Sequence, residues 1–269
     1  MKQRIDVWLT AHGLAESREK AQALIMAGQV YIGEKKVMKA SETVAEDAPV
    51  NLRGVQEHFA SRGGHKLEKA ITAFQADVSG QVAMDIGAAA GGFTDVLLRH
   101  GAAHVYAIDV GYGQLDWRLR NDGRVTVMER TNARTLTGDC FPLHPTLTVM
   151  DVSFISIKLI LPVAAAIMGA EGRFLTLVKP QFEAGRGQVG KNGVVREKEV
   201  HERVLREICL FAPSFHWHVQ NLTFSPIKGP EGNIEYLGWL KKGQWEPGAV
   251  DAADIVRQSH EALDREEKE

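Results

Sequence analysis

The chain has 269 residues, of which 44% are hydrophobic and 25% are charged, and its formal net charge is -2. This length predicts one large domain, or an ordinary domain with a small one, whose core needs neither disulfides nor a structural metal. Two cysteines exclude a disulfide framework and favour a reducing cytoplasm, while the near-neutral charge excludes a uniformly basic surface but allows a local basic site.

Residues 1–59 predict a small α+β module in which helices precede strands. Apolar residues recur within residues 4–12, and Ser17 is placed to cap a helix that runs through Met26 and ends before Gly28. Three short apolar segments then predict strands, at residues 30–32, 36–38 and 50–52. A segment this short forms only a marginal core, which favours an accessory module over an independent enzyme.

Basic side chains outnumber acidic ones in residues 1–41, unlike in the chain as a whole. Such a surplus is compatible with an ordinary solvated surface. It also predicts a site for nucleic-acid phosphates if the basic groups of the helix and the hairpin converge. The candidate RNA-binding residues of this segment are Arg4, Arg18, Lys20, Lys35, Lys36 and Lys39.

From Gln81 onward, short apolar runs alternate with segments of helix length. This alternation predicts an α/β fold with a doubly wound, mostly parallel sheet. Its seven expected strands lie at residues 82–86, 104–108, 125–128, 146–150, 173–178, 217–224 and 234–240. Residues 246–269 are strongly acidic, which predicts a mobile or loosely docked helix.

A glycine-rich turn at residues 85–94 joins the first of these strands to a helix. Its small residues allow a ligand close to the backbone, and the helix start offers unpaired N–H groups; a tight turn without a ligand is the alternative. The spacing departs from the G-x-G-x-x-G pattern of dinucleotide sites, and Asp85 would repel a pyrophosphate but attract the ammonium of a methionine moiety. These features favour S-adenosylmethionine (SAM) over NAD.

Other residues of this region are placed to contact the same cofactor. Asp109 ends the second strand, where an acid would bind a ribose diol in either a SAM or an NAD site. Phe93 would pack against the adenine or the methionine stem, or else within the core. The candidate cofactor-binding residues are Asp85, Gly87, Ala88, Gly91, Gly92, Phe93, Asp109 and Asp151.

The fourth and fifth strands end in opposite charges, Asp151 and Lys179. A lysine that closes an apolar strand must keep its charge solvated or paired, and Asp151 would supply the partner. A purely structural ion pair is the alternative interpretation. The fourth strand ends without the cysteine nucleophile of cytosine-carbon methyltransferases and without the paired prolines typical of exocyclic-amine methyltransferases.

Two further charged residues complete a pattern that resembles a known family. The FtsJ-like ribose 2′-O-methyltransferases have a Lys-Asp-Lys-Glu tetrad, matched here in order by Lys66, Asp151, Lys179 and Glu235. The surrounding motifs are similar to those of the TlyA, or hemolysin A, family of ribosomal RNA methyltransferases, over roughly residues 1–242. These motifs are Ser-Arg-Gly-Gly-x-Lys at 61–66, Asp-Ile-Gly-x-x-x-Gly-Gly-Phe-Thr at 85–94, Asp-Val-Gly-Tyr-Gly-Gln-Leu at 109–115, Asp-Val-Ser-Phe-Ile-Ser at 151–156 and Val-Lys-Pro-Gln-Phe-Glu at 178–183.

The resemblance implies a two-domain enzyme. Residues 1–59 would form the small RNA-binding domain shared with ribosomal small-subunit protein four and pseudouridine synthases. Residues 66–245 would form a Rossmann-like, SAM-dependent methyltransferase domain, preceded by a linker at 60–65 and followed by an acidic tail at 246–269. Two features depart from the family pattern: Phe59 stands where a larger Tyr or Trp is common, and the tail lies outside the pattern.

The resemblance also implies the reaction, which is methyl transfer from SAM to a ribose 2′-hydroxyl, of a cytidine, in ribosomal RNA or ribosomal subunits. Lys179 would bond the 2′-oxygen, Asp151 would orient Lys179, and Lys66 and Glu235 would fix the ribose and the lysines. No metal, membrane or obligate protein partner is expected, and the location would be cytoplasmic. Further candidate RNA-binding residues are Arg62 and, in a glycine-rich loop expected to be mobile, Arg186 and Lys191.

Three other functions remain open. A membrane-active hemolysin would need a spanning or strongly amphipathic segment. The longest apolar run, Leu159–Ala170, is interrupted by Pro162 and is shorter than the roughly 20 residues that cross a bilayer, and residues 1–6 lack the apolar region of a secretion signal. A SAM-binding RNA chaperone without catalysis would not need the tetrad. A small-molecule methyltransferase would not need the N-terminal module.

Overall fold

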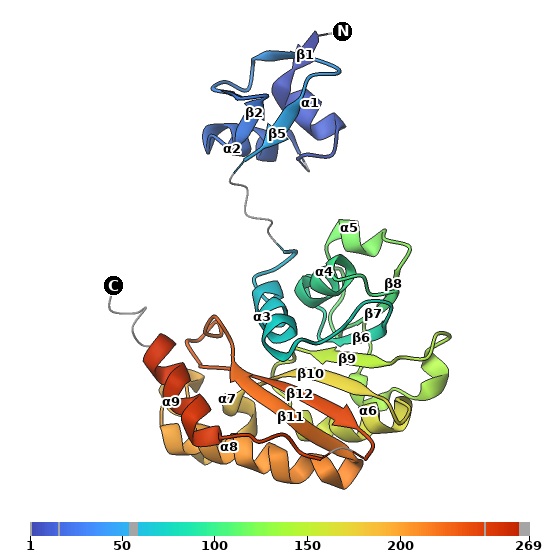
Figure 1. The fold of residues 1–269 in the computed structure, drawn as a ribbon, viewed down its shortest axis with the longest axis vertical. Helices are drawn as coiled ribbons and strands as arrows, with labels where there is room; N and C mark the ends of the chain where they lie inside the picture. The colour runs from blue at the N-terminus through green and yellow to red at the C-terminus, as the bar shows by residue number, and fades with distance from the viewer. Residues whose placement is uncertain (1, 16, 54–58, 245, 264–269) are drawn as a thin grey trace. The chain divides into compact units, whose positions relative to one another are not determined.

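The computed structural model describes residues 2–15, 17–53, 59–244 and 246–263. The chain divides into two compact units, residues 1–58 and residues 59–269 (Figure 1). The first contains the short helices and strands expected there, and the second contains the alternating strands and helices.

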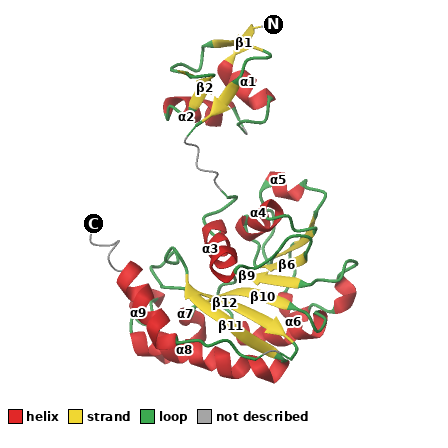
Figure 2. Ribbon diagram, in the orientation of Figure 1, coloured by secondary structure: helices red, strands yellow, loops and turns green. Residues whose placement is uncertain are grey.

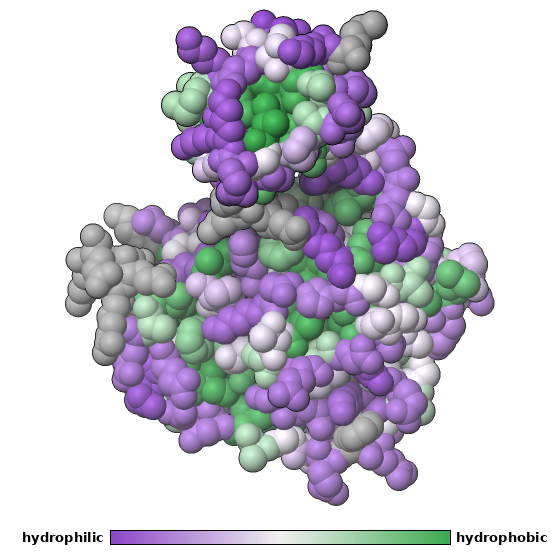
Figure 3. Space-filling model, turned by 45° about the horizontal axis from the view of Figure 1, so that its top comes forward, coloured by the Kyte–Doolittle hydropathy of each residue, from purple (hydrophilic) through white to green (hydrophobic). Residues whose placement is uncertain are grey.

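The N-terminal unit folds around a small apolar core that includes Ile5, Leu9 and Val30. Its helices are α1 (Ile5–Ala11) and α2 (Arg18–Met26), and its strands are β1 (Lys2–Arg4), β2 (Val30–Ile32), β3 (Lys35–Lys36), β4 (Thr43–Ala45) and β5 (Val50–Leu52). The Ser17 hydroxyl accepts a hydrogen bond from the Lys20 backbone N–H at 3.3 Å, so the predicted cap of α2 is confirmed. Figure 3 shows apolar side chains reaching the surface of this unit inside a border of hydrophilic ones.

The strands of this unit form two small sheets. β2 pairs antiparallel with β3 and with β5, which confirms the predicted hairpin and final strand, although β3 covers Lys35–Lys36 where residues 36–38 were expected. β1 pairs with β4, a sheet that the apolar pattern does not predict. The reason is composition, because β1 reads Lys-Gln-Arg and β4 buries a single side chain, Val44.

A seven-stranded sheet forms the centre of the second unit (Figure 2), in the order β11-β12-β10-β9-β6-β7-β8. Its strands are β6 (Val82–Ile86), β7 (His104–Ile108), β8 (Val125–Met128), β9 (Leu147–Met150), β10 (Arg173–Val178), β11 (Trp217–Phe224) and β12 (Tyr236–Lys242). β12 runs antiparallel to β10 and to β11, whereas the pairs from β10 to β8 are parallel. The predicted doubly wound, mostly parallel sheet is therefore confirmed.

Helices cover both faces of this sheet. Successive residues of each strand point to opposite faces, so a strand of apolar residues presents an apolar surface on each side that must be covered. In β6, Ala83 packs into the cluster that contains α3 and α4, while Met84 packs into the cluster that contains α6, α8 and α9. The helices are α3 (Gly64–Phe74), α4 (Gly92–Arg99), α5 (Trp117–Arg120), α6 (Leu161–Ile167), α7 (Pro180–Glu183), α8 (Lys198–Phe211) and α9 (Ala252–Leu263). None of the helices in the described ranges is long and apolar enough to span a bilayer.

The C-terminal helix α9 packs firmly on the second unit, so the expectation of a mobile or loosely docked helix is wrong. Its residues Val256 and Leu263 are 2% and 4% exposed and join the larger apolar cluster beside α8. The Tyr236 hydroxyl lies 3.2 Å from the hydroxyl of Ser259. The expectation failed because the apolar residues of this segment recur at helical spacing between charged residues, so they form one buried face. Arg257 pairs with acidic neighbours on the outer face.

Candidate functional site

Three charged residues meet at one edge of the central sheet because of strand direction. Asp151 follows β9 and Lys179 follows β10, so both lie at the carboxyl ends of parallel strands. Glu235 precedes β12, which runs the other way, and Val178 is paired with Tyr236 in the sheet. This register places Lys179 beside Glu235, at the edge where open α/β sheets bind ligands.

Lys66, from the first turn of α3, completes a ring of alternating charges. The Lys66 Nζ atom lies 2.6 Å from Glu235 Oε2 and 3.5 Å from Asp151 Oδ2. The Lys179 Nζ atom lies 2.5 Å from Asp151 Oδ1 and 4.0 Å from Glu235 Oε1. The structure thus brings together all four residues predicted to be catalytic.

The ring is buried and electrically balanced. The side chains of Lys66 and Glu235 are 5% and 1% exposed, whereas that of Asp151 is 20% exposed and is the most accessible of the four. Buried charges are tolerated when each is paired, and here two ammonium groups face two carboxylates. The arrangement fixes both ammonium groups in place before any substrate binds.

Glycines in the segment before Lys66 allow it to reach the ring. The turn is closed by the Lys66 backbone N–H, which donates to the Gly63 carbonyl at 2.9 Å. A Cβ at Gly64 would overlap the Phe59 ring, and a Cβ at Gly92 would overlap the Ser61 hydroxyl. The turn therefore requires Gly64 to pack against Phe59, and it requires Gly92 to pack against the start of α4.

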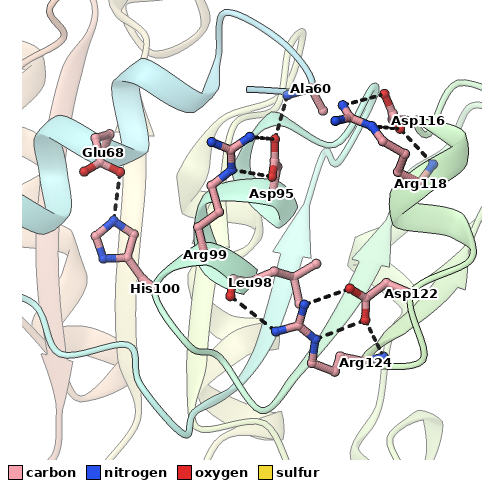
Figure 4. A network of polar contacts seen from close by, with 10 residues as sticks. All are labelled: Ala60, Glu68, Asp95, Leu98, Arg99, His100, Asp116, Arg118, Asp122 and Arg124. Atoms are coloured by element: carbon pink, nitrogen blue, oxygen red, sulfur yellow. Dashed lines mark hydrogen bonds and ion pairs between the residues drawn. The ribbon is translucent and has the colours of Figure 1, made fainter. Parts of the chain in front are cut away.

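The segment predicted as a linker, residues 60–65, is part of the second unit. The Ala60 backbone N–H donates to Asp95 Oδ2 at 2.9 Å, and Asp95 also accepts from the guanidinium of Arg99 (Figure 4). Arg99 in turn lies over the ring of Phe59, 5.0 Å from its centroid. Figure 4 also shows Glu68 of α3 bonded to a histidine that follows α4. These contacts join the predicted linker and α3 to α4, which sequence spacing alone does not reveal.

A cavity of about 660 Å³ opens at the ends of β6, β7 and β9. Asp109 lines it, and its carboxylate accepts hydrogen bonds from the backbone N–H groups of Ala89 at 2.8 Å and Gly111 at 2.6 Å. The other lining residues are Ile86, Gly87, Ala89, Ile108, Val110, Gln114, Thr131–Arg134, Asp151–Ser156 and Leu159. Thr131–Arg134 were not predicted as site residues. Their position after the third parallel strand is the one feature of the sequence that could have indicated this role.

The glycine-rich loop beside this cavity is shaped by the protein's own packing. Gly87 and Gly91 have φ values of +88° and +93°, in the left-handed region that favours glycine. A Cβ on Gly87 would collide with the Asp151 carbonyl, and one on Gly91 would collide with Leu119. The requirements of a tight turn therefore account for both glycines. The absence of a side chain at Gly87 lets the loop pack against the end of the strand that precedes Asp151.

Asp85 lies beneath this loop, so its carboxylate is not placed to meet the ammonium of a methionine moiety directly, contrary to what the sequence led us to expect. Its side chain is 1% exposed and lines neither cavity of the site. One oxygen accepts from the Thr94 hydroxyl at 2.7 Å, and the other has no hydrogen-bond partner among the residues that the structure describes. Burial raises the pKa of Asp85 to about 7. Thr94 reaches back from α4 to cover the carboxylate, a contact that the motif does not reveal.

A second cavity, of about 250 Å³, lies over the charged ring. It is lined by Lys66, Asp151 and Lys179 together with Arg62 and the predicted cofactor-site residues Ala88, Gly92 and Phe93. It shares Gly87, Ala89, Asp151 and Ser153 with the larger cavity. The two cavities therefore meet at Asp151, so a group bound in one can reach a group bound in the other.

Ser153 is a site residue that the sequence did not single out. It lines both cavities, and its hydroxyl lies 3.4 Å from Lys179 Nζ. The only available signal was its position two residues after Asp151. Among the residues that the structure describes, no group of His, Cys, Asp and Glu side chains could hold a metal ion.

In the N-terminal unit, two of the predicted RNA-binding residues share one buried carboxylate, Asp6. Arg4 and Arg18 approach the Oδ2 atom of Asp6 at 2.9 Å and 3.2 Å, while their own side chains are 46% and 54% exposed. Hydrogen bonds from Arg4 first, and then from Gln22 and Arg18, hold the pKa of the Asp6 carboxyl well below its usual range. Asp6 was missed, because a single acid in an apolar helix gives no pattern.

The other predicted RNA-binding residues are distributed over both units. Lys20, Lys35, Lys36 and Lys39 are exposed, and Lys35 lies 3.6 Å from Glu42. The side chains of Arg186 and Lys191 lie outside the described part of the structure. The end of their loop is tied down, because the Asn233 side chain bonds the Gly193 carbonyl at 2.9 Å and the Val195 N–H at 3.0 Å.

Comparison with known proteins identifies both parts of the chain. Residues 59–242 match the family model of the FtsJ-like methyltransferases, and residues 3–50 match the S4 domain. The 16S/23S rRNA (cytidine-2'-O)-methyltransferase TlyA of Mycobacterium tuberculosis is 44% identical over 88% of this chain and 89% of its own length. Hemolysin A of Brachyspira hyodysenteriae is 42% identical over 87% of this chain and 98% of its own length.

A solved structure has the same fold along the whole chain. It belongs to a Streptococcus thermophilus protein named as a hemolysin, which is 43% identical, covers 100% of this chain with 99% of its own, and superposes with a TM-score of 0.77. The family model covers most of the chain, and the relatives extend over nearly all of it. The chain therefore belongs to the FtsJ-like methyltransferase family and carries an N-terminal S4 domain.

Proposed function

We propose that this protein transfers a methyl group from SAM to the 2′-hydroxyl of a cytidine ribose in ribosomal RNA. The observation that carries the proposal is the closed ring of Lys66, Asp151, Lys179 and Glu235 where the two cavities meet. Membership of a methyltransferase family supports the reaction class, and the name of the Mycobacterium tuberculosis relative supports cytidine and the 2′-oxygen.

The larger cavity suits SAM in size and in chemistry. Its volume of about 660 Å³ lies within the range of about 300–1,000 Å³ that is common for small-molecule sites. Ile108 and Leu159 provide apolar walls, and Asp109 would hold the ribose hydroxyls at the end of β7. When bound, SAM supplies an electrophilic methyl group on its sulfonium.

The ring would act on the ribose in the smaller cavity. A 2′-hydroxyl is a weak nucleophile at neutral pH, so the protein must stabilise negative charge on its oxygen as the new C–O bond forms. Lys179 Nζ would donate a hydrogen bond to this oxygen, Asp151 would orient Lys179, and the hydroxyl proton would pass directly to the Asp151 carboxylate, which lines both cavities. Lys66 and Glu235 would hold this pair and the ribose, and a neutral hydroxyl adds no charge to the balanced ring.

The S4 domain would bind the RNA substrate, which we expect to be ribosomal RNA or an assembled subunit in the cytoplasm. Phosphate contacts from exposed lysines and arginines position an RNA without reading its sequence. Arg62 lines the smaller cavity and would contact the backbone next to the target ribose. The remaining residues proposed for RNA binding are Arg4, Arg18, Lys20, Lys35, Lys36, Lys39, Arg186 and Lys191.

Transfer of labelled methyl groups tests the proposal. The protein is incubated with tritiated SAM and either naked ribosomal RNA or purified subunits, and the RNA is then treated with alkali. Label that resists alkaline cleavage of the adjacent linkage indicates ribose methylation. Lys179→Ala should abolish transfer with little change in SAM affinity, and Lys198→Ala, at an exposed lysine of α8, is the matched control. Near-normal turnover by the Lys179 variant would contradict the assignment.

A further inference from the structure

The one-turn helix α7 begins directly after Lys179 and ends at Glu183. Opposite it runs the loop of residues 151–157, which leaves β9 at Asp151 and enters a 3₁₀ turn at Ile157. Six residues of this loop, Asp151–Ser156, line the larger cavity and form one of its walls. The shape of the cofactor cavity therefore depends on where this loop lies.

The helix and the loop touch at three points along their length. At one end, Lys179 contacts Asp151 at 2.5 Å, as part of the charged ring. In the middle, the rings of Phe154 and Phe182 lie 5.2 Å apart. The third point joins Glu183, the last residue of α7, to the other end of the loop.

At that third point, the Glu183 carboxylate accepts two hydrogen bonds. The Ser156 hydroxyl donates to Oε2 at 2.5 Å, and the Ile157 backbone N–H donates to Oε1 at 2.8 Å. Ser156 in turn accepts from the Lys158 backbone N–H at 3.1 Å and so caps the 3₁₀ turn. One carboxylate thus fixes both the side chain and the backbone at the far end of the cavity wall.

We propose that Glu183 is a positioning residue for the cofactor cavity, which holds the far end of loop 151–157, while the near end is fixed by the sheet, where the Asp151 backbone N–H donates to the Ile86 carbonyl at 3.1 Å. This inference rests on the proposed use of the larger cavity by SAM. A partly buried carboxylate is costly unless its oxygens are bonded, and burial raises the pKa of Glu183. Simple packing would be served as well by an apolar side chain, so the acid indicates a role for its two accepting oxygens.

Removing this anchor should weaken SAM binding more than it slows the chemical step. Glu183→Ala frees the end of the wall that lies away from the ring, so the dissociation constant and the KM for SAM should rise about tenfold, the effect of losing roughly 1.4 kcal/mol. The kcat at saturating SAM should change less than threefold, because Asp151 and Lys179 keep their contacts. Ser156→Ala, which removes a hydroxyl only, should raise the same two constants in the same direction.

Glu183→Gln is the variant that separates positioning from charge. Its amide oxygen can accept from the Ile157 N–H, and its amide nitrogen can donate to the Ser156 hydroxyl, so SAM affinity should return to within about twofold of wild type. The exposed Glu199 of α8 provides the control variant Glu199→Ala. SAM affinity is measured by calorimetry on the full chain, with S-adenosylhomocysteine as a second probe.

Three results would overturn the inference. They are unchanged SAM affinity in Glu183→Ala, a loss of kcat without a change in SAM affinity, and a Gln variant as impaired as the Ala variant. Thermal unfolding of each variant shows whether the protein is folded, and Ser156→Ala keeps the test valid if Glu183→Ala is not. Because binding is measured without RNA, a wild-type protein that binds SAM but leaves RNA unmethylated would contradict the proposed reaction and not this inference.

Discussion

Lys66 and Glu235 form an ion pair of 2.6 Å although 169 residues separate them in the chain. One lies before the first strand of the large sheet and the other before the last strand, so the pair forms only when the whole unit is folded. It joins the turn at residues 61–64 to the edge of the sheet and closes the ring around Asp151 and Lys179.

The Lys66–Glu235 pair allows stability to be separated from catalysis. Glu235→Leu leaves a buried ammonium without its nearest partner and should reduce the free energy of unfolding by about 3–5 kcal/mol. The double variant Lys66→Met with Glu235→Leu removes both charges and should recover most of that loss. It should still be inactive in methyl transfer. Urea unfolding and the transfer assay measure the two effects, and an active double variant would show that the pair is only structural.

Asp85 should make stability depend on pH. Its pKa is about 7 in the folded protein against an ordinary 3.8, so between these values the folded state keeps a proton that the unfolded state releases. The free energy of unfolding should fall as pH rises through this window, by on the order of 4 kcal/mol from this group.

Asp85→Asn removes this dependence. The stability of the variant minus that of wild type should be greater at pH 8 than at pH 4. Thermal unfolding at both pH values measures this difference. Asp139→Asn, at an exposed position, is the control. A stability difference between Asp85→Asn and wild type that is the same at both pH values would show that Asp85 titrates as an ordinary carboxyl.

Arg18 should contribute to RNA binding through its charge. Asp6 holds the guanidinium in place while about half of the side chain remains exposed, so little ordering is needed when a phosphate binds. Arg18→Gln should weaken RNA binding and reduce the slope of log affinity against log salt by about one. SAM affinity should not change. Filter binding over a salt series measures the slope, and a slope equal to that of wild type would remove Arg18 from the interface.

The helix α9 should contribute to the stability of the second unit. Removing residues 252–269 exposes the apolar surface that Val256 and Leu263 cover, and should lower the unfolding midpoint. Val256→Ala alone should cost about 1–3 kcal/mol, and an exposed change in the same helix, Gln258→Ala, should cost less than about 0.5 kcal/mol. Equal unfolding midpoints for the truncated and full chains would indicate a loosely attached tail.

Much of the large sheet could be predicted because its strands are buried and its connecting segments are long. The predicted start of the last strand was two residues early, since Ile234 and Glu235 lie in the irregular segment before β12. The short strands β1 and β4 escaped prediction, because β1 has no apolar residue and β4 is three residues long and buries only Val44. Apolar patterning thus identifies strands that are buried, but not strands held mainly by backbone pairing.

The tetrad positions follow from the order of motifs, but their geometry does not. The pairing of Val178 with Tyr236 in the sheet makes Lys179 and Glu235 neighbours, and this register cannot be read from the sequence. Glu183 and Ser153 act through contacts between segments, which leave no periodic signal in the sequence. The burial of Asp85 likewise depends on Thr94, a residue of the following helix.

The most direct test of the account is nucleoside analysis of ribosomal RNA treated with this protein and labelled SAM. RNA digested to nucleosides should contain labelled 2′-O-methylcytidine with the wild-type protein and none with Lys179→Ala, while both proteins bind SAM equally. Label found only in base-methylated nucleosides, or equal amounts of 2′-O-methylcytidine from both proteins, would contradict the proposed role of the ring.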